Sequence, residues 1–243
     1  MASIKDAVEE SFSDNHALIK YFLFAIPLYI TYIFYESNDT GFVFWLFAIF
    51  TFLLMLGTLT ICTTNVRHNK NQIFPGLNIL AILKQALKTL IAIGPTMLIN
   101  LGLAAFITSQ FTLPNPSVDK AFKIIIWCVF SSVIFTGFLL YVKDLKIKDA
   151  YNLKAISEFG ADIMMAVIFM IPLVLLSNAI LLGSITYIFI LFFGIPNPVW
   201  LFICAMFVFQ NISVIGNYLA QIAMENIEIK VEMEKYDRGE TSI

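Results

Sequence analysis

The sequence predicts an all-α integral membrane protein, with six transmembrane helices arranged as three repeated helical hairpins and with amphipathic helices at the membrane interface. The first observation behind this prediction is the composition, because 59% of the 243 residues are hydrophobic and only 13% are charged. A soluble domain of this size needs a more polar surface. The second observation is the presence of six long apolar stretches. The third is a short motif that recurs three times along the chain.

Each apolar stretch has roughly the 20 residues, or more, that a helix needs to cross the ~30 Å hydrocarbon core of a bilayer. Together they take up more than half of the chain, so the sequence predicts a single transmembrane domain over 1–243. The first residues are charged and acidic, and no cleavage site follows a short apolar core, so we expect no signal peptide. The six stretches cover residues 17–35, 42–62, 86–108, 121–142, 163–193 and 199–223.

Lys and Arg gather on one side of the predicted membrane. Of the 15 Lys and Arg residues, 13 lie on the side that holds the segments before the first span and after the second, fourth and sixth spans, if Lys20 and Lys88 at the adjoining ends of two spans are counted, and the exceptions are Lys120 and Lys123. Cytoplasmic loops carry the excess of Lys and Arg. We therefore expect the protein in the plasma or inner membrane, with both termini in the cytoplasm. The loops 36–41, 109–120 and 194–198 are then expected outside.

The recurring motif is a Phe followed seven residues later by a Gly, with a polar residue directly after the Phe. It occurs in every second span at a spacing of about 80 residues, which indicates an internal repeat. We expect three hairpins over about 1–70, 71–148 and 149–230, with an exposed tail over 227–243, and we expect the repeat glycines to pack against neighbouring helices. The pairs are Phe50 and Gly57, Phe130 and Gly137, and Phe209 and Gly216.

The other three spans each contain a proline, at Pro27, Pro95 and Pro172. Proline kinks a membrane helix, and the alternative is a hinge or an unwound segment that lines a site. Before two of these spans lie mixed apolar and charged stretches, 76–88 and 149–162. We expect them to form amphipathic helices that lie flat at the membrane interface. The alternative is that they extend the following span into water.

The last span carries several amide side chains within an apolar helix. Gln210, Asn217 and Gln221 fall on the same face as Gly216, and this face should point at other helices because lipid cannot satisfy an amide. The residue after the repeat Phe is polar in every copy: Thr51, Ser131 and Gln210. This recurrence predicts that Gln210 makes a hydrogen bond between helices.

Asn217 and Gln221 have no amide at the equivalent positions of the other copies. Hairpin packing therefore does not require them, and we interpret them as candidate contacts for a ligand or a partner, with Asn100 and Asn178 as further candidates in the third and fifth spans. On this interpretation, replacing Gln210 by Leu lowers stability, whereas replacing Asn217 and Gln221 by Leu leaves folding intact.

The sequence offers no group for catalysis. The middle of each span lacks a charged residue, the two histidines fall outside the spans, and there is no nucleophile–His pair or HExxH motif. The three cysteines, Cys62, Cys128 and Cys204, match no metal-binding spacing. We therefore expect no enzyme, no cofactor and no metal site. A net charge of −2 also gives no reason to expect nucleic acid as a partner.

Three stretches carry a resemblance to a known family: "AVEESFSDNHALIKYFLFAIPLYI" at 7–30, "NLKAISEFGADIMMAVIFMIPLVLL" at 152–176 and "IGNYLAQIA" at 215–223. Over most of its length the chain is similar to a family of bacterial and archaeal multi-pass membrane proteins, domain of unknown function 4013. The resemblance implies a multi-pass membrane fold. The family brings no known substrate, so the resemblance implies no site residue.

Two functions follow as expectations. A non-catalytic scaffold, assembly factor or subunit of a larger complex is favoured because the polar residues follow the repeat and the spans lack charges. Its partners are then the lipid bilayer and other membrane proteins or a second copy of the chain. The alternative is a carrier for a small neutral or lipid-like molecule, favoured by the prolines and by the amides of the last span. A cavity that reaches the middle of the membrane distinguishes the two.

Overall fold

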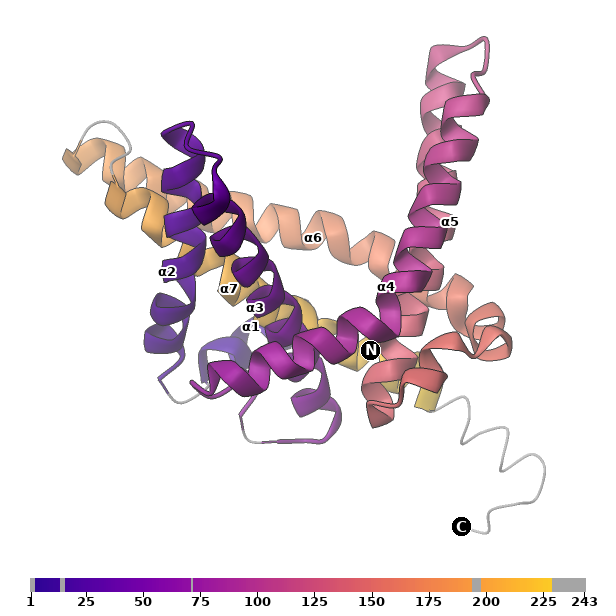
Figure 1. Ribbon diagram of the computed structural model, residues 1–243, viewed down its shortest axis with the longest axis horizontal. Coiled ribbons are helices and arrows are strands. Elements are labelled where there is room, and N and C mark those ends of the chain that lie inside the picture. The colour runs from indigo at the N-terminus through magenta and orange to yellow at the C-terminus, as the bar shows by residue number, and fades with distance from the viewer. Residues whose placement is uncertain (1–2, 14–15, 71, 194–197, 229–243) are drawn as a thin grey trace. The chain divides into compact units, whose positions relative to one another are not determined.

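The computed structural model of the chain is built from helices (Figure 1). It describes residues 3–13, 16–70, 72–193 and 198–228, and none of these residues is in a strand, so the all-α prediction is confirmed. Two of the elements are short, a 3-10 helix η1 and a π-helix η2. The elements are α1 (Ile4–Ser13), α2 (Ala17–Glu36), α3 (Phe42–Arg67), α4 (Ile79–Gln110), α5 (Pro116–Asp144), η1 (Ile147–Tyr151), α6 (Leu153–Phe193), α7 (Pro198–Ala223) and η2 (Met224–Glu228).

In the part of the chain that the structure describes, five helices are long and apolar enough to cross a membrane. They are α2, α3, α4, α5 and the helix from Pro198 to Ile227, and they coincide with five of the six predicted spans. The remaining predicted span, 163–193, falls within the 41-residue helix α6. Many side chains of α6 lie outside the described residues, so its crossing of the membrane stays a prediction.

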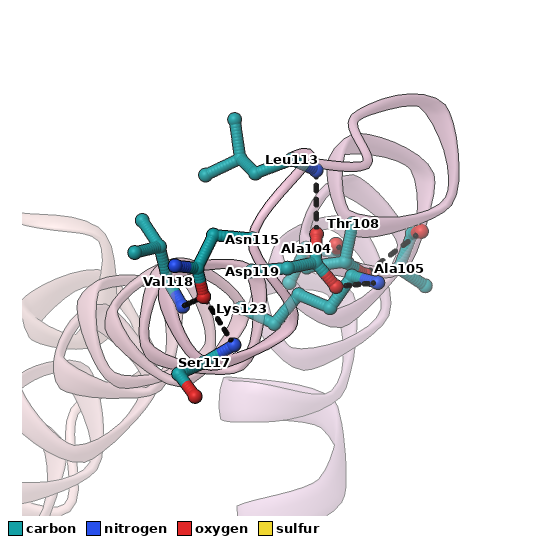
Figure 2. Close-up of polar contacts among 9 residues, drawn as sticks. All are labelled: Ala104, Ala105, Thr108, Leu113, Asn115, Ser117, Val118, Asp119 and Lys123. Atoms are coloured by element: carbon teal, nitrogen blue, oxygen red, sulfur yellow. Dashed lines mark hydrogen bonds and ion pairs between the residues drawn. The ribbon is translucent and has the colours of Figure 1, made fainter.

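The turn between α4 and α5 shows why a helix starts where it does (Figure 2). The side chain of Asn115 accepts hydrogen bonds from the backbone N–H groups of Ser117, at 2.9 Å, and Val118, at 3.4 Å. Proline as the first residue of α5 suits this position because its missing N–H would have no partner inside the helix. Asp119 then accepts from the N–H of Leu113 and pairs with Lys123 at 2.7 Å. The loop thus falls within the predicted 109–120.

The loop between α2 and α3 lies at residues 37–41 and agrees with the predicted loop 36–41. The third predicted loop, 194–198, lies outside the described residues except for Pro198, which begins α7. The tail predicted over 227–243 likewise lies outside them beyond residue 228.

The chain forms two compact units, which are described separately. One consists of Ser3–Leu87 and Ile171–Tyr218, and the other contains Lys88–Met170 and the chain from Leu219 onward. The boundaries between the units fall inside α4, α6 and α7 rather than between the predicted hairpins. The hairpin repeat therefore stays a prediction.

The core of the unit 3–87 with 171–218 is an aromatic cluster. The Phe24 ring meets the rings of Phe74, at a centroid distance of 5.0 Å, and of Phe209, at 5.7 Å, while Tyr21 meets Phe74 at 4.9 Å. All these pairs are edge to face, the arrangement that the charge distribution of aromatic rings favours. Phe74 lies in the segment after α3 and is fully buried, so this segment is folded back onto α2.

The repeat glycines mark the closest approaches of helices to neighbouring segments. A Cβ placed on Gly57 would collide with the backbone carbonyl oxygen of Ile82 in α4, and one placed on Gly137 would lie 2.9 Å from the carbonyl oxygen of Ala150 in η1. Real Cβ atoms essentially never come within 3.0 Å of a non-bonded heavy atom. Only glycine permits these contacts, because any other residue would push the two backbones apart.

The third repeat glycine, Gly216, makes the same kind of contact between α7 and α3. An added Cβ would lie 2.8 Å from the Cβ of Cys62 and 3.3 Å from backbone atoms of Leu59 and Thr63. The prediction that the repeat glycines pack against neighbouring helices is therefore confirmed for Gly57 and Gly216, whereas Gly137 packs against the short 3-10 helix η1 that follows α5.

The three prolines lie inside α2, α4 and α6, in the predicted spans. The amphipathic stretch 76–88 does not form a separate helix, because α4 begins at Ile79 and continues without a break to Gln110. The stretch 149–162 is divided between the end of η1 and the start of α6. Both stretches thus run into the following span, as in the alternative above, and their place at a membrane surface stays a prediction.

Candidate functional site

Asn217 is the best-defined of the predicted site residues. It is completely buried, and its side-chain Nδ2 donates a hydrogen bond of 2.7 Å to Oε2 of Glu10. Glu10 is near the end of α1 and belongs to the same unit. A hydrogen bond to an ionised carboxylate is shorter and stronger than one between neutral groups. The amide predicted to contact a ligand or partner thus holds α1 against α7.

Gln210 lies two turns earlier on α7 and is 4% exposed. Its Oε1 is buried and has no hydrogen-bond partner in the described part of the protein. The prediction of an interhelical hydrogen bond at this repeat position is met in the first copy, where the hydroxyl groups of Thr31 and Thr51 lie 3.3 Å apart across α2 and α3. The prediction is wrong for the side-chain oxygen of Gln210, because the helices that pack against α7 place no hydrogen-bond donor near this atom.

Two further buried side-chain oxygen atoms also lack a hydrogen-bond partner among the described residues. Ser213 Oγ, one turn after Gln210 on α7, and Thr58 Oγ1 on α3 are buried and have no partner among the described residues. Buried polar atoms are nearly always hydrogen-bonded in folded proteins, and each one left unpaired costs ~1–3 kcal/mol. Three such atoms, on the two helices that meet at Gly216, mark this part of α7 as the least satisfied polar region that the structure describes.

A pocket of ≈ 140 Å³ lies beside Gln210, between α1, α2 and α7. Phe12 and Leu18, two of the lining residues, are 47% and 63% exposed. The Tyr21 hydroxyl is already used, since it donates to the backbone oxygen of Ser11 at 2.7 Å. The Gln210 amide oxygen is inaccessible as well, so the wall of the pocket is apolar throughout. The lining residues are Phe12, Leu18, Tyr21, Ile203, Met206, Phe207 and Gln210.

The size of the pocket limits what it can hold. Sites for drug-sized molecules usually enclose about 300–1,000 Å³, whereas an engineered apolar cavity of about 150 Å³ holds one benzene. The pocket therefore accommodates one small ring or the end of one chain.

The other predicted site residues have different surroundings. Asn100 is half-buried, and its Nδ2 donates to the backbone oxygen of Thr96, one turn earlier in α4, at 2.8 Å. That contact is local to its own helix. Gln221 is half-buried near the end of α7. Asn178 is part of α6, but its side chain lies outside the described residues.

The chain matches no family model, no curated protein and no solved structure. The resemblance to domain of unknown function 4013 accordingly stays a prediction.

Sequence reasoning missed the residues of α1 that complete this region, Glu10 and Phe12. The charged stretch before the first span reads as a solvated segment, because Lys5, Asp6 and Glu9 surround its apolar residues. A helical projection gives some signal, since Ala7 and Ser11 are one turn apart, and both are completely buried in the structure. Within the described residues, no group of three or more His, Cys, Asp or Glu side chains is placed to hold a metal ion.

Proposed function

We propose that this chain is a non-catalytic, multi-pass protein of the plasma or inner membrane, with both termini in the cytoplasm. It serves as a scaffold, an assembly factor or a subunit of a larger membrane complex. The observation that carries the proposal is the hydrogen bond between Asn217 and Glu10. Asn217, a completely buried amide of the last span, makes a hydrogen bond within the protein.

The small residues support the same proposal. Gly57, Gly137 and Gly216 each occupy a position where a neighbouring segment approaches too closely for a side chain. Such contacts are the main way in which helices associate in lipid, where no hydrophobic driving force acts between them. These glycines, together with the bond between Asn217 and Glu10, hold the helices in a fixed arrangement. A protein with such an arrangement is suited to bind partners on its surface.

The experiment is a mass measurement on the native assembly. Membranes are extracted with a mild detergent, and the complex that contains this 27.5 kDa chain is weighed by native mass spectrometry. The proposal expects a complex of fixed stoichiometry with at least one other membrane protein or a second copy. It also expects that variants such as Asn217→Leu lose their cellular effect in proportion to the loss of folded protein. A chain that remains alone in native membranes and in detergent contradicts the proposal.

A carrier for a small neutral or lipid-like molecule is the second candidate. The pocket beside Gln210 favours it, and so do the prolines inside α2, α4 and α6. Transport by proteoliposomes that contain the chain alone supports this alternative if transport stops when Met206→Trp fills the pocket. Transport that is unchanged in the variant counts against it.

A further inference from the structure

The chain between α5 and α6 presents lysines together with apolar side chains. This basic segment, residues 143–154, runs from the last turn of α5 through η1 to the start of α6, within one of the two units. Its four lysines and two aspartates leave a net charge of +2, although the whole chain carries −2. Basic residues beside apolar ones are typical of segments that lie at a membrane surface. The exposed lysines are Lys143, Lys146, Lys148 and Lys154, and the apolar residues, between 38% and 76% exposed, are Leu145, Ile147, Tyr151 and Leu153.

The backbone of the basic segment folds back along α5. Leu145 ends the helix in a left-handed conformation, with φ 55°, and its N–H donates to the backbone oxygen of Tyr141 at 2.8 Å. Ala150 then lies against Gly137, where an added Cβ would be 2.9 Å from the Ala150 carbonyl oxygen. An α-helix rises 1.5 Å per residue, so Gly137 lies about 10 Å before the end of α5 at Asp144. The segment therefore returns by that length instead of continuing away from the helix.

This contact fixes the depth of η1 in a bilayer. Helix α5 is long and apolar enough to cross a membrane, and Gly137 falls inside its predicted span, 121–142. Ala150 is buried and level with Gly137, so η1 lies beside the apolar part of α5. The Tyr151 hydroxyl donates to the backbone oxygen of Ile91 at 3.3 Å and holds the segment to α4 as well. The basic segment is thus kept at the edge of the hydrocarbon region.

We propose that the basic segment binds anionic phospholipids of the leaflet at this end of α5. Its lysine ammonium groups contact the headgroup phosphates, and its apolar side chains lie among the outer ends of the acyl chains. A lysine places its methylene stem along apolar surface while its charge stays in the polar layer. This end of α5 is predicted to be cytoplasmic, and the cytoplasmic leaflet carries the negative surface charge.

The depth of the segment favours a lipid over a soluble acidic protein, because a soluble protein does not reach the level of Gly137. The ion pair between Lys146 and Asp144, at 3.1 Å, leaves Lys146 able to bind a phosphate, because both side chains are exposed and such pairs are weak. The inference rests on the multi-pass part of the proposed function and does not depend on the scaffold role. A chain that remains alone in native membranes but binds anionic lipid keeps this inference and rejects the scaffold.

The first test compares two phospholipids with the same acyl chains, dioleoyl phosphatidylglycerol, which is anionic, and dioleoyl phosphatidylcholine, which has no net charge. Each is added to the purified full-length protein in a mild detergent, and native mass spectrometry measures the dissociation constant of the first bound lipid. We expect the anionic lipid to bind at least tenfold more tightly. Equal binding of the two lipids by the unaltered protein overturns the proposal.

Lysine substitutions locate the site. The triple variant Lys146→Gln, Lys148→Gln and Lys154→Gln should bind the anionic lipid at least tenfold more weakly, since each basic residue near an anionic surface contributes about fivefold. The matched control replaces three exposed lysines on the same predicted side by Gln and should leave the preference unchanged. A preference that survives in the first variant, or that falls equally in both, overturns the proposal. The control lysines are Lys5, Lys70 and Lys84.

A competition separates a lipid from a free phosphate compound. Glycerol phosphate carries the anionic group without acyl chains, so it should not displace phosphatidylglycerol at millimolar concentration, because the apolar side chains of the segment contribute to lipid binding. Displacement by glycerol phosphate would show an anion site that does not need a lipid, and it would overturn the assignment.

The depth of the segment is measured independently of lipid affinity. With the native cysteines replaced, a nitroxide is attached to Leu153→Cys, or to Ser117→Cys near the other end of α5, and the protein is placed in phosphatidylglycerol liposomes. Electron paramagnetic resonance then compares collisions with oxygen, which enters the bilayer, and with a water-soluble nickel chelate. The label at 153 should favour oxygen and the label at 117 the chelate. A label at 153 as accessible to the chelate as that at 117 contradicts the proposal.

Discussion

Asn217 in α7 and Glu10 in α1 are joined by a 2.7 Å hydrogen bond although they are 207 residues apart in the sequence. The amide is completely buried, whereas the Glu10 residue is exposed. The bond therefore connects the interior of a helix bundle to its surface. It gives α1, a helix of 10 residues, a fixed place, although isolated helices shorter than about 12–15 residues are marginal in water.

Replacing Asn217 by Leu should destabilise the protein, because it removes the donor from this contact and inserts an apolar side chain at a buried polar position. We expect a loss of about 1–3 kcal/mol and a lower thermal unfolding temperature. This result reverses the sequence-based prediction that leucine at 217 leaves folding intact. Glu10→Gln keeps an acceptor oxygen and should cost less. Equal stability of Asn217→Leu and the unaltered protein would show that the bond is not needed.

Gln210→Leu should behave in the opposite way. The substitution removes an acceptor that has no partner in the described structure, and it keeps a similar volume beside an apolar pocket. We expect the unfolding temperature of the ligand-free protein to stay the same or to rise, with a gain of up to about 1 kcal/mol. Chemical or thermal unfolding in detergent measures it, with Asn217→Leu as the matched amide-to-leucine control on the same helix. A marked loss of stability would favour the sequence-based prediction of an interhelical bond.

Gly216→Leu should be strongly destabilising, since even a Cβ would lie 2.8 Å from Cys62 Cβ. Overfilling a close helix contact typically costs ~1–3 kcal/mol, and here α3 and α7 must also separate. Gly183→Leu in α6 is the control, because a Cβ there meets nothing within 4 Å. Thermal unfolding of the two purified variants should differ clearly. Similar unfolding temperatures would contradict the packing of α7 on α3.

The orientation in the membrane is tested by cysteine labelling. With the native cysteines replaced, single-cysteine variants at Asn38 and Ser117 should react with an impermeant thiol reagent on intact cells, because Asn38 lies in the turn between α2 and α3 and Ser117 lies in the first turn of α5. Lys148→Cys, in η1 on the side predicted to be cytoplasmic, should react only after the cells are opened. Labelling of Lys148→Cys from outside would invert the orientation.

The apolar parts of the helices were predictable from hydropathy, although α4 and α6 begin at Ile79 and Leu153, before the predicted spans 86–108 and 163–193, because a helix can continue through polar residues. The predicted span 17–35 is α2, Ala17–Glu36, and the predicted 199–223 is α7, Pro198–Ala223. The repeat glycines were also predictable, since a glycine that recurs at one depth of a membrane helix indicates close packing.

The polar contacts were not predictable, because a repeat in sequence does not give equivalent positions the same neighbours. Thr51 faces Thr31 across a hairpin, whereas Gln210, its equivalent, lines a pocket. The partner of Asn217 comes from the charged stretch before the first span, and no local pattern connects the two. The pocket depends on side chains from three helices, so it exists only once they are packed.

The bond between Asn217 and Glu10 also sets an order of events during synthesis. Chains are made at about 5–20 residues per second, so the 207 residues that separate the partners delay the arrival of Asn217 by roughly 10–40 s. During that interval Glu10 has no bond to Asn217, while the helices between α1 and α7 are made. The α1–α7 contact can form only after residue 217 has been made, so it cannot guide the placement of the helices that precede α7.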